Sequence, residues 1–185
     1  MEIFLGLLTC VALVLILYAT VQYNGMVALR NHIAESWSDI DTELKRRYDL
    51  IPNLVATVKG YAAHENAVLE RVTQLRAQCA ASTGSPARQS ADESRLVDAL
   101  GQLLAVVENY PDLKADTAYL KLQDELIITE NRIQAARRFF NGNVRDYKNK
   151  QESFPSNLVA TTFNFGPAEF FNVEPVKRTA PNTKF

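Results

Sequence analysis

The sequence predicts an all-α protein with an N-terminal transmembrane helix, an elongated antiparallel helical bundle and a Phe-rich C-terminal tail. Three observations predict this fold class. Residues 3–21 carry no charge, apolar residues then recur at helical spacing between residues 33 and 147, and the 185 residues include only 7 Gly and 7 Pro. Since alternating strand patterns are nearly absent before residue 155, all-β and Rossmann-type folds are disfavoured.

The first element is the predicted membrane anchor, residues 1–25. Its 19 charge-free residues are enough, as a helix, to span a hydrocarbon core of about 30 Å. Tyr18 and Tyr23 stand where an aromatic belt would lie. A cleaved signal peptide is the alternative, but the acidic Glu2 occupies the place of the cationic region that such a peptide needs. The span is expected to lead directly into the first helix of the bundle, at a junction that the Asn24-Gly25 pair would loosen.

The charges after the anchor bear on location and partners. All 20 Lys and Arg follow residue 24, which favours a cytoplasmic body by the positive-inside rule. Only Arg30 lies close to the anchor, however, and the lone body cysteine, Cys79, indicates no disulfide framework, so a periplasmic body stays open. The body is formally neutral, with 20 basic and, after Glu2 is subtracted from 21, 20 acidic residues. This balance argues against nucleic acid as a partner.

Residues 26–155 form the predicted bundle. Mainly apolar residues spaced alternately four and three apart from Ile33 to Leu75 predict one long helix. Pro52 is expected to bend this helix, or to divide it into two if the bend is sharp. Residues 82–94 lack large apolar side chains and predict an exposed loop, in which Ser90 and Glu93 would cap a helix over residues 91–108. The last helix is expected over residues 113–150, with Asp112 as its cap.

Three polar residues interrupt the apolar stripes of the predicted helices: Arg47, Glu65 and Thr129. Buried polar residues in such stripes often fix the register or the number of helices in a coiled coil. The alternative is that Arg47 and Glu65 lie at the edge of the stripe and extend their polar ends into water.

The tail, residues 156–185, differs in kind from the bundle. Eight of the nine Phe follow residue 138. Phe163 and Phe165 alternate as in a short strand, and Phe170 and Phe171 form a doublet. So much apolar surface must be buried against the bundle, the lipid surface or a second copy of the chain. The four Phe side chains are therefore the predicted residues of tail docking and self-association.

The sequence shows no catalytic, cofactor or metal signature. The residues three before His32 and His64 are Leu29 and Tyr61, so the Glu-x-x-His pairs of di-iron bundles are missing. A Gly-rich phosphate loop and a Gly-x-Ser-x-Gly elbow are missing too. The acidic clusters at residues 39–43 and 124–130 are interpreted as solvated helix faces. We expect a protein without enzymatic activity and without a cofactor.

Several segments resemble the signature of the LemA family, in the same order and over residues 23–171. They are LRN at residues 29–31, ESWSDID at 35–41, LKRRYDLIPNLV at 44–55, VKGYA at 58–62, YPDLKA at 110–115 and FPSN at 154–157. Phe140 stands where the family more often has Tyr. The resemblance implies a bacterial inner-membrane protein with one span and a helical bundle. It implies no agreed catalytic activity, and the family includes a member tied to the biogenesis of magnetosome membranes.

The predicted function follows from the anchor, the helices and the missing active site. We expect a non-enzymatic membrane-anchored scaffold that self-assembles through its helical bundle and tail and organises or remodels the bacterial inner membrane. The alternative is an accessory subunit that docks onto another membrane protein, such as a protease or transporter. The expected partners are the lipid bilayer, further copies of the chain and other membrane proteins.

Overall fold

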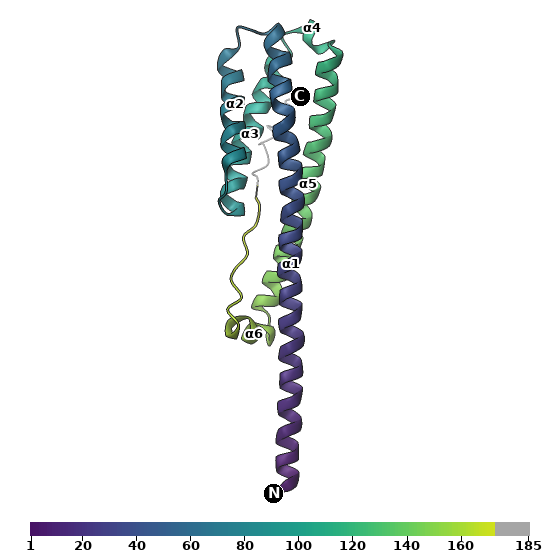
Figure 1. Cartoon of the computed structure of the whole chain (residues 1–185), viewed down its shortest axis with the longest axis vertical. Coiled ribbons are helices and arrows are strands. Elements are labelled where there is room, and N and C mark those ends of the chain that lie inside the picture. The colour runs from purple at the N-terminus through teal and green to yellow at the C-terminus, as the bar shows by residue number, and fades with distance from the viewer. Residues whose placement is uncertain (173–185) are drawn as a thin grey trace, which may run out of the picture. The chain divides into compact units, whose positions relative to one another are not determined.

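The structure, a computed structural model, describes residues 1–172 and is helical in all its regular elements (Figure 1). Its helices are α1 (Glu2–Tyr61), α2 (Asn66–Ala81), α3 (Pro86–Val107), α4 (Pro111–Lys114), α5 (Thr117–Glu152) and α6 (Ser156–Thr162). The predicted all-α class is confirmed. Of the predicted tail, residues 173–185 lie outside the described residues.

Helix α1 carries the apolar N-terminal run. Among residues 1–172 it is the one helix long and apolar enough to cross a membrane, and its apolar window is not buried by the rest of the chain. The prediction that the span leads directly into the first helix of the body is confirmed, because α1 passes through Asn24 and Gly25 without a break. Gly25 permits a close approach, because an added Cβ would clash with Lys150 Nζ.

The described residues divide into two compact units, each of which is treated by itself. Unit 1 consists of Met1–Asp39 with Ala136–Glu169, and unit 2 consists of Ile40–Ala135 with the residues from Phe170 onward. Helices α1 and α5 contribute to both units.

Unit 1 has an aromatic and apolar core. Met26, Tyr147, Ala160 and Phe165 are its buried cluster. The Phe165 amide donates a hydrogen bond to the Ala160 carbonyl (3.0 Å). The Tyr147 hydroxyl donates one to the Gly166 carbonyl (2.8 Å). The segment after α6 is thus bonded to helices α6 and α5. The predicted short strand over Phe163 and Phe165 is wrong, since these residues have no strand partner within the described chain.

Unit 2 contains the later part of α1, the first part of α5, and α2 to α4 between them. Helices α1 and α5 run antiparallel here, since Glu43 pairs with Arg132 (3.6 Å) and Tyr61 donates to Asp116 (3.0 Å). The connections at residues 62–65 and 82–85 are short, so α2 reverses on α1 and α3 reverses on α2. Figure 1 shows α2 and α3 side by side.

The prediction of one helix over residues 33–75 with a bend at Pro52 is wrong about where the chain breaks. Helix α1 continues through Pro52 and ends at Tyr61. Proline lacks the amide that would bond to the carbonyl four residues earlier, that of Tyr48. The Arg76 Nε of α2 donates to this carbonyl instead (3.0 Å), so the group that Pro52 leaves unpaired is satisfied from the neighbouring helix.

Two helix starts also differ from the prediction. Helix α3 begins at Pro86, within the predicted loop, and proline at a first helical position needs no amide partner. Ser90 and Glu93 are buried inside this helix and do not cap it. Helix α5 begins at Thr117 and is capped by Asp116, whose Oδ1 accepts from the amides of residues 118 and 119 at 2.8 and 2.9 Å. Asp112 lies in α4 and is not that cap.

Candidate functional site

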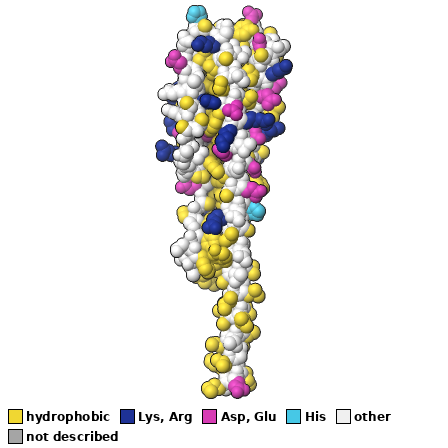
Figure 2. Space-filling view, viewed as in Figure 1, with side chains coloured by type: hydrophobic (Ala, Val, Ile, Leu, Met, Phe, Trp, Pro, Cys, Tyr) yellow, Lys and Arg dark blue, Asp and Glu magenta, His cyan; other side chains and the backbone are white. Residues whose placement is uncertain are grey.

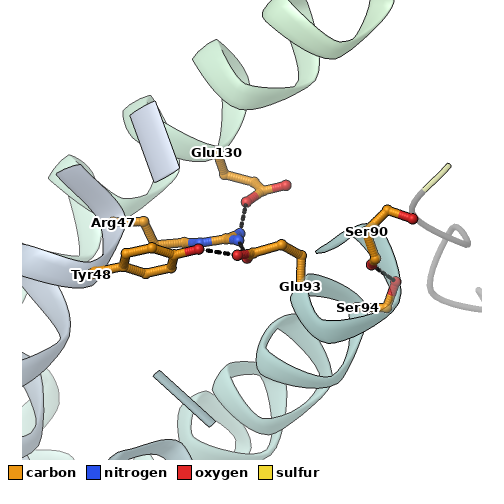
Figure 3. A network of polar contacts seen from close by, with 6 residues as sticks. All are labelled: Arg47, Tyr48, Ser90, Glu93, Ser94 and Glu130. Atoms are coloured by element: carbon orange, nitrogen blue, oxygen red, sulfur yellow. Dashed lines mark hydrogen bonds and ion pairs between the residues drawn. The ribbon is translucent and has the colours of Figure 1, made fainter. Parts of the chain in front are cut away.

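The most unusual polar site of the described chain is a buried ion-pair network in unit 2, centred on Arg47. Arg47 lies on α1 and is 3% exposed. Its Nη2 donates to the carboxylate of Glu93 on α3, and its Nη1 donates to Glu130 Oε2 on α5 at 2.9 Å (Figure 3). One guanidinium therefore joins three helices.

Tyr48 and Cys79 complete the surroundings of Glu93. The Tyr48 hydroxyl donates to Glu93 Oε1, so the two carboxylate oxygens have different partners (Figure 3). Burial, followed by the negative charge of Glu93, raises the pKa of the Tyr48 phenol well above its usual range. The same two causes raise the pKa of the Cys79 thiol to about 12. Both groups thus stay protonated at neutral pH, and the site offers no thiolate or phenolate nucleophile.

The charges of the network are not evenly exposed. The Glu130 side chain is 37% exposed and keeps contact with water, whereas Glu93 is buried and depends on Arg47 and Tyr48. Removing one partner of a buried pair leaves an uncompensated charge, which is far more costly than losing a surface pair. The arrangement fixes the helices relative to one another within unit 2. It does not resemble a metal centre, and no cluster of three metal-binding side chains occurs in residues 1–172.

The three predicted polar stripe residues have different positions. Arg47 is buried, so the alternative that it extends into water at the stripe edge is wrong for this residue. Glu65 is not on a helix, because it lies in the turn between α1 and α2, where it accepts from the Tyr110 hydroxyl (3.3 Å). Thr129 is fully buried next to Glu130 on α5, and its Oγ1 has no hydrogen-bond partner among the described residues.

Sequence reasoning missed Glu93 and Tyr48. A signal for Glu93 was present, because it continues the spacing of the α3 residues that are buried. They are Ser90, Glu93, Leu96, Ala99, Leu100, Leu103 and Val107. The residues of α3 before Leu96 include no large apolar side chain, so apolar spacing alone predicts a loop there.

The four predicted docking residues of the tail are distributed over both units. Phe165 is buried in unit 1 and Phe171 in unit 2. Beyond Phe171, the Asn172 carbonyl accepts from the Ser90 hydroxyl of α3 (2.9 Å). Phe170 is half-buried, and Phe163 is exposed. Two of the four rings are therefore already covered by their own chain, and docking on a second copy stays a prediction.

The long apolar helix and the helical body that follows it indicate a membrane-associated helical protein. A family model described as the LemA family matches residues 36–185. The chain belongs to the LemA family, which confirms the resemblance noted in the sequence.

Curated relatives agree with this assignment. Protein LemA of Metamycoplasma hominis is 26% identical over 160 residues, covering 86% of this chain and 73% of that protein. Magnetosome protein MamQ 2 of Paramagnetospirillum magneticum is 25% identical over 183 residues, covering 85% of this chain and 67% of the relative. Magnetosome protein MamQ of Magnetospirillum gryphiswaldense is 24% identical with the same coverage.

Proposed function

We propose that this protein is a non-enzymatic, membrane-anchored scaffold that self-assembles and organises or remodels the bacterial inner membrane. The proposal takes the helices after the anchor as one antiparallel bundle that is the assembling body. Its cytoplasmic location is proposed from the basic residues, all of which follow the anchor. The magnetosome names of two relatives fit a role at a membrane.

The observation that carries the proposal is an exposed apolar face on α5 in unit 2. Leu120, Ile127 and Ile128 are large apolar residues that stay exposed on this helix. Their spacing of seven and eight residues places them on one side of it. An apolar face of this kind gains free energy when a second helix covers it.

Anchoring strengthens any such contact. Copies held in one membrane plane by α1 meet at a raised effective concentration, so even weak contacts between bodies become multivalent. The buried network supports a structural role as well, because the raised pKa values of Tyr48 and Cys79 leave no activated nucleophile in it.

The test is the mass of the native complex after extraction of the full chain in mild detergent. We expect a homomeric assembly that a Leu120→Ser/Ile127→Ser/Ile128→Ser variant dissociates with unchanged helicity. Gln134→Ser, an exposed polar position of the same helix, is the matched control and should leave the assembly intact. A stoichiometric foreign partner would support the accessory-subunit function instead. A monomer would contradict the scaffold.

A further inference from the structure

A second exposed apolar surface lies around α6 in unit 1. Phe154, Leu158 and Phe163 are 80%, 59% and 53% exposed. They belong to a run of 16 residues, 153–168, without a charged or histidine side chain. Figure 2 shows hydrophobic side chains gathered over α6, beside the apolar part of α1. An uncharged surface with three large apolar groups is unusual for a face in contact with water.

Contacts with Tyr23 place this surface at the end of the anchor. The Phe163 ring lies 4.9 Å from the Tyr23 ring, centroid to centroid, and the Phe165 ring lies 5.4 Å from it. Tyr23 follows Val21, the last residue of the charge-free run, by two residues, or ~3 Å along the helix axis. Phe163 therefore lies at the level where the apolar part of the anchor ends, the depth that aromatic side chains favour in membranes.

Positive charges lie just beyond that level. The Lys150 ammonium lies against α1 at Gly25, and the Arg30 guanidinium lies 5.8 Å from the centroid of the Phe165 ring. Gly25 and Arg30 are four and nine residues past Val21, or ~6 and ~14 Å along the axis. The headgroup layer on each side of a bilayer is about 5–7 Å thick. Lys150 thus lies at headgroup depth, where a cation is attracted by lipid phosphates.

We infer that α6 and its flanks lie in the interface of the bilayer that α1 crosses, with Phe154, Leu158 and Phe163 inserted among the lipids. Lipid is the occupant that the structure favours, because this surface is continuous with the exposed anchor through Tyr23 and is followed by cations. The surface would hold unit 1 against the membrane at a second point, as interfacial helices do. The inference rests on the membrane anchorage within the proposed function but not on self-assembly.

The test measures the depth of a single tryptophan in the full-length protein reconstituted in vesicles. Leu158→Trp is introduced into a Trp37→Phe background, because Trp37 is the only Trp of the chain. With phospholipids brominated near the headgroup end of the acyl chains, we expect strong quenching of the new tryptophan. Phe154→Trp repeats the measurement just before α6, and circular dichroism checks that each variant keeps its helicity.

Phe139→Trp is the matched control in the same background and in the same unit. Phe139 is 61% exposed, and its neighbour Phe140 packs against Trp37 of α1. Trp37 is 16 residues past Val21, or ~24 Å along the axis, so position 139 should not be quenched.

Vesicle flotation separates the outcomes. Protein that fails to float with the vesicles would overturn both the anchorage and this inference. Protein that floats, but whose tryptophan at position 158 is not quenched, would overturn this inference alone. A blue-shifted but unquenched emission would show that protein, and not lipid, covers the surface. Equal quenching at positions 139 and 158 would also contradict this inference, because unit 1 would then lie flat on the membrane.

Discussion

The two units share helices α1 and α5 but differ in the chemistry of their interiors. Unit 2 has a buried cation between two carboxylates, Arg47 with Glu93 and Glu130. The polar groups inside unit 1 are neutral: buried Ser36 donates to the His32 carbonyl (2.7 Å) and accepts from Asn143 (3.1 Å). A shift of one helix would leave a buried charge unpaired in unit 2, whereas in unit 1 it would disrupt only packing and neutral hydrogen bonds. The same pair of helices therefore encloses buried charges in unit 2 and only neutral buried polar groups in unit 1.

The largest expected effect comes from breaking the charge centre of unit 2. Glu93→Ala leaves Arg47 buried with Glu130 alone, and we expect a loss of about 3–5 kcal/mol in the free energy of unfolding of unit 2. Urea titration followed by circular dichroism measures the loss. An Arg47→Met/Glu93→Leu double variant should recover most of it, since it removes both buried charges together.

Arg132→Ala is the matched control for this experiment. It removes a more exposed pair with Glu43 (3.6 Å) and should cost about 0–1 kcal/mol. Similar losses in the free energy of unfolding for Glu93→Ala and Arg132→Ala would show that unit 2 depends no more on its buried ion pairs than on exposed ones.

The next effect tests whether unit 1 depends on shape. Phe165→Ala removes a buried ring from the cluster with Met26 and Tyr147, and we expect a loss of about 3 kcal/mol from cavity formation. Hydrogen exchange should show lost amide protection in α6 and the end of α5, with unit 2 unchanged. Phe163→Ala, at an exposed ring, should cost less than about 1 kcal/mol in detergent. Lost protection in unit 2 as well would mean that the two units unfold together.

The smallest effect is the pH dependence that one buried thiol gives to unit 2. The Cys79 pKa is raised from 9.0 to about 12, so above pH 9 the unfolded chain loses this proton while the folded chain keeps it. The contribution of the Cys79 thiol to the free energy of unfolding is fully present below pH 9 and decreases as the pH rises toward 12. Cys79→Ser should flatten that fall in denaturation midpoints measured between pH 7 and 11. Cys10→Ser, which changes the exposed cysteine, should leave it unchanged; equal slopes for both would refute this assignment.

Sequence patterns predicted the fold best where many residues repeat one spacing. Tyr119, Ile133, Phe140 and Tyr147, which recur at multiples of seven residues within the predicted last helix, are buried. The start of α3 was not predictable from apolar pattern alone, because residues 86–94 contain no large apolar side chain. Glu93, within this stretch, accepts a hydrogen bond from Arg47, which is 46 residues away in sequence. Such tertiary contacts override local preference.

Only part of the candidate site could be predicted from the sequence. Arg47 and Thr129 stood out because each interrupts an otherwise apolar stripe, and both are buried. The partner of Arg47 could not be assigned while Glu93 was placed in a loop. The continuation of α1 through Pro52 could not be predicted from the sequence either. It is accompanied by a hydrogen bond from the distant Arg76 to the Tyr48 carbonyl, which Pro52 leaves unpaired.

Because α1 passes without a break from the anchor to the buried core of unit 1, the anchor and this core have a fixed rotational relation about the helix axis. A helix turns by about 100° per residue, so the direction of every anchor side chain is set relative to Met26, which belongs to that core. One residue inserted between Val21 and Met26 would rotate the core by about 100° relative to the anchor. Any side-by-side pairing of anchors within the bilayer therefore also determines which face of unit 1 each copy turns toward its neighbour.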